Sequence, residues 1–257
     1  MATALQPATP GQSIRVLTVN THKGFGVFNR AFVLHDLREA VRDVGADLVF
    51  LQEVQGEHSG HSDRTATWPE EPHYEFLADR IWPEYAYGRN AVYPEGHHGN
   101  ALLSKYPIVE WSNHDVSIGP REMRGLLHCV LRVAGRDIEV HAICVHLGLQ
   151  ESQRRHQLDL LCKLADKVPA GAPLLVAGDF NDWRHRAHCI LQGCAGLSEV
   201  FVHAHGHAAK TFPAAFPLLQ LDRIYVRNAL GHAPMKLPRQ PWARLSDHAP
   251  LGAEIWL

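Results

Sequence analysis

Residues 174–182 read LLVAGDFND, in which an apolar run ends in a glycine and is followed within four positions by two carboxylates and an amide. A short apolar run that ends in a turn residue predicts a buried strand over 174–177. Asp179 and Asn181 then lie just beyond the end of that strand. One carboxylate in such a place is usually a turn or cap residue, so this stretch gains meaning only if the pattern recurs.

The pattern recurs along the chain. Polar side chains stand at one end of five further apolar runs: Asn20 and His22 after IRVLTV, Glu53 after DLVFLQ, His146 after IEVHAICV, Asp222 before IYV, and Asp247 with His248 before APLGAEIW. Strand ends that meet at one rim of a sheet bring such groups together. Six runs of this kind therefore predict a single polar cleft.

The side chains collected in this way are rich in oxygen. They comprise the carboxylates of Glu53, Asp179, Asp222 and Asp247 and the amides of Asn20 and Asn181. Hard oxygen ligands suit Mg²⁺ or Mn²⁺ better than zinc, and carboxylates that repel one another in a cleft favour a cation between them. His146 and His248 add groups that exchange protons near neutral pH. The set favours metal-assisted attack of water on a phosphoester.

Other catalytic classes lack their motifs. The chain has no G-x-S-x-G elbow, no P-loop, no dinucleotide fingerprint and no H-E-x-x-H zinc spacing. Each of these motifs provides a nucleophile, a phosphate cradle or a metal geometry that its chemistry requires. Serine hydrolases, nucleotide-binding enzymes and zinc proteases of those types are therefore not indicated.

Composition limits the partners. The chain has 257 residues, 25 Lys and Arg against 27 Asp and Glu, and 46% hydrophobic residues. This is ordinary for a globular protein, and the balanced charge disfavours long duplex DNA as a partner. The sequence shows no membrane-spanning apolar run and no secretory signal, which predicts a cytoplasmic protein. No oligomer is implied.

Cysteine and histidine usage raise two further questions. The five cysteines are scattered at 129, 144, 162, 189 and 194, so we expect reduced buried thiols rather than a disulfide framework. The 19 histidines gather in Gly-rich pieces at 57–61, 95–100 and 203–207. We interpret most of them as solvated loop residues, with a histidine-based zinc or nickel site as the alternative.

The periodicity of the remaining chain predicts the fold class. Residues 1–12 are expected to be a flexible tail and 13–257 a single domain. A helix is expected from Asn29, as its cap, to Val44, ending at Gly45, and others over 74–81 and 150–168. Residues 55–72 are expected to be a long loop. Strands are expected over 14–20, 47–51, 85–92, 100–104, 108–116, 125–133, 136–145, 219–226 and 249–256, with a turn at 134–135. Consecutive strands exclude a purely parallel sheet and favour an α+β sandwich with outer helices.

Seven pieces of the chain, in order, carry a resemblance to a known family. They are VNTHKG (19–24), LQEVQ (51–55), HGNALLSKYPI (98–108), VHLGL (145–149), GDFN (178–181), LDRIYV (221–226) and SDHAPL (246–251). Together they resemble the endonuclease/exonuclease/phosphatase superfamily, which includes DNase I, exonuclease III, neutral sphingomyelinases and inositol polyphosphate 5-phosphatases. The resemblance covers residues 14–257 and looks closest to small bacterial metal-dependent hydrolases. It implies a four-layer, DNase I-like α/β-sandwich with two packed mixed sheets between helices.

The resemblance also implies roles at the metal and the water. Glu53 is the principal ligand of Mg²⁺, with Mn²⁺ as a possible substitute; Asn20 helps to hold the ion, and Asp247 lies at its edge. Asp179 orients or deprotonates the attacking water. The identity of the general base stays open.

Further roles implied by the resemblance concern the phosphate. Asn181 supports the scissile phosphate, His146 contacts its oxygens, and His248 faces it with Asp222 as orienting partner. His22 is a departure, because DNA-repair members carry a carboxylate there. This moves the chain away from the apurinic nucleases and makes His22 a candidate for substrate binding.

Four more residues are candidates for substrate binding, each with a simpler structural alternative. Arg121 and Arg124 would grip phosphate or belong to a solvated turn. Asn100 would touch the phosphate or cap a strand. Trp183 would form a stacking wall or a partly buried part of the core.

The sequence thus predicts a Mg²⁺-dependent phosphoesterase acting on a phosphodiester or phosphomonoester, with nucleic acid or a phospholipid headgroup as possible substrate. The alternatives are a nuclease acting on DNA or RNA and a non-catalytic phosphoryl-binding protein. The presence of Glu53, Asp179 and His248 disfavours the last.

Overall fold

The computed structural model describes residues 13–27, 31–62, 65–119, 122–133 and 139–257. These residues form two six-stranded mixed sheets, in the order β11-β12-β1-β2-β4-β3 and β5-β6-β7-β8-β10-β9. Within each sheet one central pair is parallel, β1 with β2 and β7 with β8, and the other pairs are antiparallel. We call them the first and the second sheet.

The elements of the first half are β1 Ser13–Asn20, a 3-10 turn His22–Gly24, α1 Leu34–Val44, β2 Leu48–His58, α2 Ser59–Ser62, α3 His73–Ala78, β3 Glu84–Tyr93, β4 Gly96–Ser104, β5 Ile108–Asp115 and β6 Gly125–Leu131. Those of the second half are β7 Val140–His146, α4 Glu151–Ala165, β8 Leu174–Asp179, α5 Ala187–Ala195, β9 Ser198–Glu199, α6 Val200–His205, β10 Asp222–Arg227, β11 Gly231–Met235, α7 Trp242–Leu245 and β12 Leu251–Trp256.

The sandwich follows from strands that are apolar on both faces. In β1, Ile14 and Val16 point into the core between the sheets, whereas Leu17 and Val19 point to the outer layer. Successive side chains of a strand face opposite sides, so a strand that is apolar at consecutive positions needs cover on both. The first sheet obtains that cover from the second sheet and from helices.

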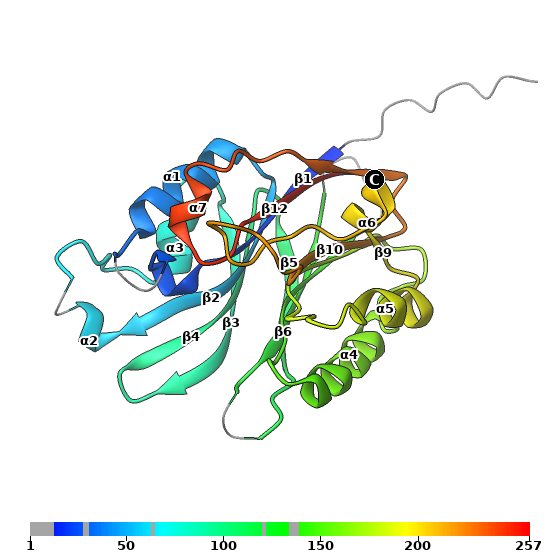
Figure 1. The fold of residues 1–257 in the computed structure, drawn as a ribbon, viewed down its shortest axis with the longest axis horizontal. Coiled ribbons are helices and arrows are strands. Elements are labelled where there is room, and N and C mark those ends of the chain that lie inside the picture. The colour runs from blue at the N-terminus through cyan, green and yellow to red at the C-terminus, as the bar shows by residue number, and fades with distance from the viewer. Residues whose placement is uncertain (1–12, 28–30, 63–64, 120–121, 134–138) are drawn as a thin grey trace, which may run out of the picture.

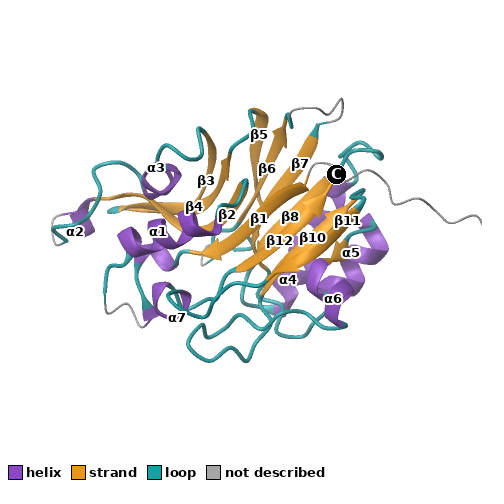
Figure 2. Cartoon of the chain, turned by 90° about the horizontal axis from the view of Figure 1, so that it is seen from above, coloured by secondary structure: helices purple, strands orange, loops and turns teal. Residues whose placement is uncertain are grey.

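The helices form the two outer layers. Helices α1, α3 and α7 pack on the first sheet, and α4 and α5 pack on the second. Figure 1 shows the two helical groups on opposite sides of the sheets, and Figure 2 shows the strands as the central part of the molecule. The predicted four-layer sandwich is confirmed.

The structure corrects several predicted boundaries. Helix α1 begins at Leu34 rather than at Asn29, because the chain before it pairs with itself through the Phe25–Phe32 bridge. Asn29 lies outside the described residues, but the end at Gly45 is confirmed by its left-handed φ of 66°. Residues 55–58, predicted as loop, continue β2 because they pair with β4.

Other elements were not predicted. The short helices α5, α6 and α7 and the edge strand β11 lie in stretches without strong periodicity. The tail 1–12, the turn at 134–135 and Arg121 fall outside the described residues, so these predictions stay predictions. None of the described helices is long and apolar enough to cross a membrane.

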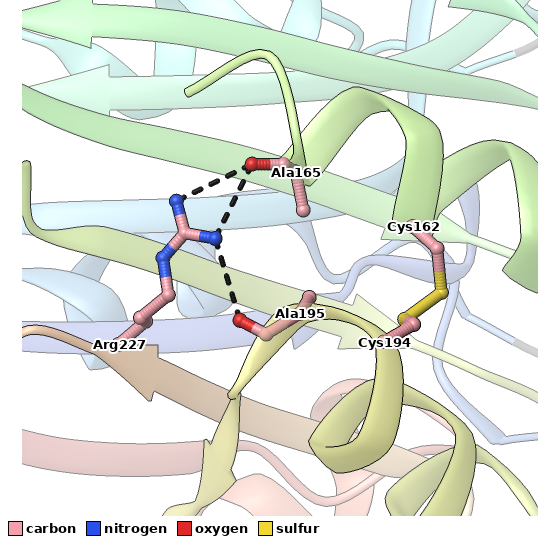
Figure 3. Close-up of a disulfide and its surroundings, with 5 residues drawn as sticks. All are labelled: Cys162, Ala165, Cys194, Ala195 and Arg227. Atoms are coloured by element: carbon pink, nitrogen blue, oxygen red, sulfur yellow. Dashed lines mark hydrogen bonds between the residues drawn. A yellow bond between two sulfur atoms is a disulfide. The ribbon is translucent and has the colours of Figure 1, made fainter. Parts of the chain in front are cut away.

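The expectation of reduced cysteines is wrong for one pair. Cys162 of α4 and Cys194 of α5 form a disulfide, drawn in Figure 3. The two residues are far apart in sequence, so their spacing did not reveal the pair; the packing of α4 against α5 brings them together. Cys129 and Cys144 are free and buried, as expected, and Cys189 is free and exposed.

Candidate active site

The strand ends of both sheets meet at one edge of the sandwich. The first sheet contributes Asn20 at the end of β1 and His248, three residues before β12. The second sheet contributes His146 and Asp179 at the ends of β7 and β8, and Asp222 at the start of β10. Side chains from the two sheets touch across this edge, since Asn20 Nδ2 lies 3.3 Å from Asp179 Oδ2. The predicted convergence of strand ends is therefore present.

Glu53 reaches this edge through an irregularity of β2. The register with β4 shifts between Leu51 and Val54, and Glu53 adopts a left-handed φ of 53°. Thr21 Oγ1 donates to the carbonyls of Gln52 and Glu53, at 3.0 Å each. Such strained residues persist only where surrounding contacts hold them, and they gather at functional sites. The bulge places the Glu53 carboxylate beside Asn20, with 3.4 Å between Oε1 and Nδ2.

Asp179, Asp222 and His248 form a buried cluster in which one potential ligand atom from each lies within 4.8 Å of the others. His248 Nδ1 bonds to Asp222 Oδ2 at 2.9 Å. His248 Nε2 lies 3.8 Å from Asp179 Oδ2. Asp222 therefore fixes the imidazole so that its other nitrogen faces Asp179.

The charges of this cluster depend on one another. Burial lowers the pKa of His248, but Asp222 and Asp179 outweigh it and raise that pKa to about 10. Burial raises the pKa of Asp179 to about 7; His248 opposes this change and Asp222 adds to it. These shifts favour a protonated His248 near neutral pH. Two carboxylates and an imidazole at one point are groups that transfer protons or bind a metal ion.

The metal-binding residues predicted from the sequence gather around Asn20. Its Nδ2 lies between Glu53 and Asp179, and its Oδ1 accepts the backbone N–H of His22 at 3.0 Å. Asp247 completes the group, because its Oδ2 lies 3.8 Å from His22 Nε2. The carboxylates of Glu53 and Asp247 are hard oxygen donors of the kind that suits Mg²⁺ or Mn²⁺. Asn20 turns its amide nitrogen toward Glu53 and Asp179 and its amide oxygen toward the His22 N–H.

Ser246 links the predicted metal ligands Asn20 and Asp247 to His248 of the cluster. Its hydroxyl donates to the Asn20 carbonyl at 2.7 Å and to Asp247 Oδ1 at 3.3 Å, and it accepts the backbone N–H of His248 at 3.2 Å. One hydroxyl thus sets the turn that presents both Asp247 and His248. Ser246 belongs to the SDH piece of the sequence, but its positioning role had no signal of its own.

His146 and Asn181 lie on the side of the second sheet. His146 Nε2 is 3.6 Å from Asp179 Oδ2, and burial, followed by Arg124, lowers the pKa of His146 well below the ordinary value. Asn181, at a left-handed φ of 47°, donates from its backbone N–H to Asp179 Oδ1 and from Nδ2 to the Leu147 carbonyl, both at 2.9 Å. Asn181 therefore orients Asp179 directly.

Two residues that the sequence did not point to, Lys23 and His98, interact electrostatically with residues of the candidate site. His98 is influenced electrostatically by Lys23, Glu53 and Arg124; burial, followed by Lys23, lowers its pKa to about 4. Lys23 has a left-handed φ of 56° in the turn after β1. Both residues lie in pieces that resemble the family, VNTHKG and HGNALLSKYPI. The available signal was therefore position within a motif; Lys23 follows β1 by three residues, and His98 lies within β4.

The remaining substrate candidates are placed differently. Arg124 Nε donates to the Leu147 carbonyl at 3.2 Å, at the edge of the site. Trp183 is 41% exposed, and its ring meets Phe212, which in turn contacts the His248 ring. Asn100 is fully buried and donates to the carbonyls of Gly125 and Cys144, so it connects the two sheets. Substrate contact by these residues stays a prediction.

The alternative of a histidine-based metal site finds little support. Among the described residues, Asp179, Asp222 and His248 form the only group of three close potential ligands. The histidine pair His128 and His141 is joined by a 2.9 Å bond but has no third ligand of this kind.

Comparison with known proteins agrees with this geometry. A family model described as the Endonuclease/Exonuclease/phosphatase family matches residues 17–248. The chain is 56% identical over 245 residues to YbhP of Escherichia coli strain K12, an uncharacterized protein, covering 95% of this chain and 97% of the relative. The match therefore spans nearly all of both proteins.

Solved structures share the fold at low identity. An endonuclease/exonuclease/phosphatase from Beutenbergia cavernae matches with a TM-score of 0.72 and 19% identity, covering 95% of this chain and 72% of that one. TDP2 from D. rerio, complexed with a single-strand DNA product, matches with a TM-score of 0.66 and 19% identity, over 95% and 98% of the two chains. With the family match over most of its length, the chain belongs to the endonuclease/exonuclease/phosphatase family.

Proposed function

We propose that the protein is a divalent-metal-dependent phosphoesterase that hydrolyses a phosphodiester or phosphomonoester by attack of water. The observation that carries this proposal is the His248–Asp222 pair aimed at Asp179, beside the oxygen donors Glu53 and Asn20. A cation, a proton acceptor and a set of carboxylates at one edge are the groups that phosphoester hydrolysis requires.

Asp179 is the proposed acceptor of the water proton. Its Oδ1 is occupied by the Asn181 backbone N–H, which leaves Oδ2 toward His146 and His248. A pKa raised to about 7 suits a general base, because efficiency is greatest when the pKa lies near the working pH. Asn181 keeps this carboxylate in place.

His248 is the proposed stabiliser of the charge that develops on the phosphoryl group. Asp222 holds its Nδ1 and keeps the ring cationic, so Nε2 presents a proton. His146, with Arg124 and Lys23 nearby, would bind phosphate oxygens. Preorganised donors of this type stabilise a transition state without rearrangement at the moment of reaction.

Glu53, Asn20 and Asp247 are the proposed holders of Mg²⁺, or of Mn²⁺ in its place. When bound, such an ion neutralises phosphate charge and lowers the pKa of water. His22 sits between Asn20 and Asp247 and is proposed to contact the substrate at this side.

The test is hydrolysis of bis-p-nitrophenyl phosphate and p-nitrophenyl phosphate with Mg²⁺, Mn²⁺ or EDTA, for the wild type and Asp179→Asn. We expect metal-dependent turnover that the substitution abolishes. Unchanged activity in Asp179→Asn would contradict the mechanism. Metal binding without turnover of any ester would instead favour a phosphoryl-binding protein.

A nuclease is the second candidate, favoured by the exposed Trp183 two residues after Asn181. An exposed aromatic ring stacks on unpaired bases, and the D. rerio TDP2 structure is described as a complex with a single-strand DNA product. Cleavage of labelled single-stranded and duplex oligonucleotides, with Trp183→Ala as comparison, tests this substrate class against a phospholipid headgroup.

A cytoplasmic location belongs to the proposal as well, and one observation weighs against it. Disulfides in which one partner is exposed, as Cys194 is, persist mainly in oxidising compartments. Cell fractionation combined with rapid alkylation of free thiols distinguishes a cytoplasmic location from an oxidising compartment.

A further inference from the structure

We propose that Arg223 and Asp182 form a positioning pair that holds the Asp222 segment and the Asp179–Asn181 segment in register. The proposal rests on the proposed function, because it concerns the alignment of that site. Arg223 bonds to the backbone of Asp222 and not to its carboxylate, and each residue of the pair follows a catalytic candidate in the sequence, Asp222 or Asn181.

The pair lies where the β8–β10 ladder ends. Asp179 and Asp222 are cross-strand partners at the last position of this ladder. Beyond it, the backbone bond from Phe180 N to the Leu221 carbonyl, at 2.9 Å, still joins the two segments. Two buried carboxylates at directly opposed positions repel each other. His248, bonded to Asp222 and 3.8 Å from Asp179, offsets part of this repulsion, and the remainder opposes pairing at the functional end of the ladder.

Arg223 grips the segment of β10 from within the core. It is 2% exposed, and its Nη1 donates to the carbonyls of Gln220 and Asp222, at 2.5 and 3.3 Å. Its Nη2 lies 3.7 Å from Asp182 Oδ2. One guanidinium thus connects the backbone of Asp222 with the carboxylate that follows Asn181.

Asp182 grips the other segment. It is 3% exposed, and its two oxygens accept the backbone N–H groups of Arg186 and Ala187, at 2.9 and 3.0 Å. These bonds anchor the Asp179–Asn181 segment to the start of α5. Through Arg223 and Asp182, that helix start, the β8 end and the β10 start become one connected unit.

Stability alone is a weak reason for such a pair. Burial of two charges carries a desolvation penalty that their attraction often fails to exceed, and apolar replacements are often as stable. Counteracting the repulsion between Asp179 and Asp222 is a role that an apolar pair does not perform. A role in aligning Asp179 and Asp222 therefore differs from a role in packing, which an apolar pair could also fill.

The same strand offers a matched control in Arg227. It lies four residues after Arg223 on β10, and its guanidinium also bonds to backbone carbonyls, those of Ala165 and Ala195 at the ends of α4 and α5. Figure 3 shows this arrangement beside the disulfide. Arg227 is half-buried and holds helix ends together, so its loss tests the effect of removing an arginine that bonds to backbone carbonyls, without disturbing the catalytic segments.

The experiment compares Arg223→Gln, Asp182→Asn, their combination and Arg227→Gln in the full chain. It measures kcat and KM for bis-p-nitrophenyl phosphate, the thermal midpoint, and the proton resonance of the His248–Asp222 hydrogen bond. We expect a loss in kcat of about 10-fold or more for each single variant, with KM changed by about twofold at most. Arg223→Lys should recover part of the loss.

The combination should be no worse than the poorer single variant, because the two residues act as one unit. Arg227→Gln should lower the thermal midpoint yet leave kcat and the His248 resonance unchanged. Normal kcat in a folded Arg223→Gln, or multiplicative losses in the combination, would overturn the proposal.

Failure of the proposed function has a different signature. If the wild type hydrolyses no ester, the His248–Asp222 resonance still reports the alignment. It should shift or broaden in Arg223→Gln and in Asp182→Asn but not in Arg227→Gln. An unchanged resonance in all three overturns the positioning role regardless of activity.

Discussion

His248 and Asp222 are joined by a 2.9 Å hydrogen bond that crosses from one sheet to the other. His248 precedes β12 of the first sheet, and Asp222 opens β10 of the second. The bond is buried, so its strength is little reduced by water. It sets both the orientation and the charge of the imidazole.

Loss of the Asp222 charge should impair catalysis. Asp222→Asn removes the partner that keeps His248 cationic, and we expect kcat to fall by about 10²- to 10⁴-fold. The measurement is the pH–rate profile with bis-p-nitrophenyl phosphate. Asp36→Asn, on the exposed face of α1, is the control and should retain full activity. Normal turnover in Asp222→Asn would remove His248 from the mechanism.

Stability should decline as the pH rises. In the folded chain the pKa of His248 is raised from 6.5 to about 10, and that of Asp179 from 3.8 to about 7. The folded state therefore binds more protons than the unfolded state, and the free energy of unfolding falls with increasing pH. The His248 contribution is complete below its unfolded pKa and is lost as the pH passes through its folded pKa.

This prediction is checked by thermal melts in EDTA across that pH range. The midpoint of the wild type should fall between pH 6.5 and 10, following the pKa of His248. His248→Gln should flatten the upper part of that range, whereas the contribution of Asp179 remains and moves to higher pH, because His248 no longer opposes the rise in its pKa. A midpoint that rises with pH in the wild type would contradict the assigned charges.

Metal dependence should rest on Glu53. Glu53→Gln keeps the size of the side chain but removes a hard anionic ligand, so we expect the metal concentration for half-maximal activity to rise by about 100-fold. Saturating Mg²⁺ should also raise the thermal midpoint of the wild type and have little effect on the variant. Equal metal titration curves for the two proteins would show that the ion binds elsewhere.

The disulfide should stabilise without contributing to the chemistry. It joins cysteines 32 positions apart, and closing a loop of this size corresponds to about 3 to 4 kcal/mol of unfolding free energy. Replacing both Cys162 and Cys194 by Ala should lower the thermal midpoint by about 10 °C at unchanged kcat. Cys189→Ala is the control, since that thiol is free and exposed. An equal midpoint in the double variant would show that the bond does not form.

The sandwich itself was predictable because its signals are local. Strands such as β1 and β7 are continuous apolar runs, and the polar residues at their ends mark the rim of a sheet. The start of α1 was not predictable, because the Phe25–Phe32 pairing delays it and no capping side chain marks it. Short helices such as α5 depend on tertiary contacts rather than on their own periodicity.

The sequence predicts a candidate site residue where that residue follows a strand. It does not predict one whose position depends on tertiary packing. Asp179 and His146 could be found from strand ends, whereas His98 lies within β4, where no strand end marks it. Ser246 bonds to Asn20, Asp247 and His248, and Arg223 bonds to the Asp222 carbonyl and pairs with Asp182. No spacing in the sequence marks residues that support a site through other residues. Such residues can be identified only in the folded structure.

Because the candidate site is divided between two sheets, the core between the sheets determines the distances between its residues. Asn20, Glu53 and His248 move with one sheet, and Asp179 and Asp222 move with the other. Side chains such as Phe50 and Leu127, which fill the space between the sheets, act as spacers that set the catalytic distances. We expect a smaller side chain at either position to change the distance between the two halves of the candidate site and so to lower the rate of the proposed reaction.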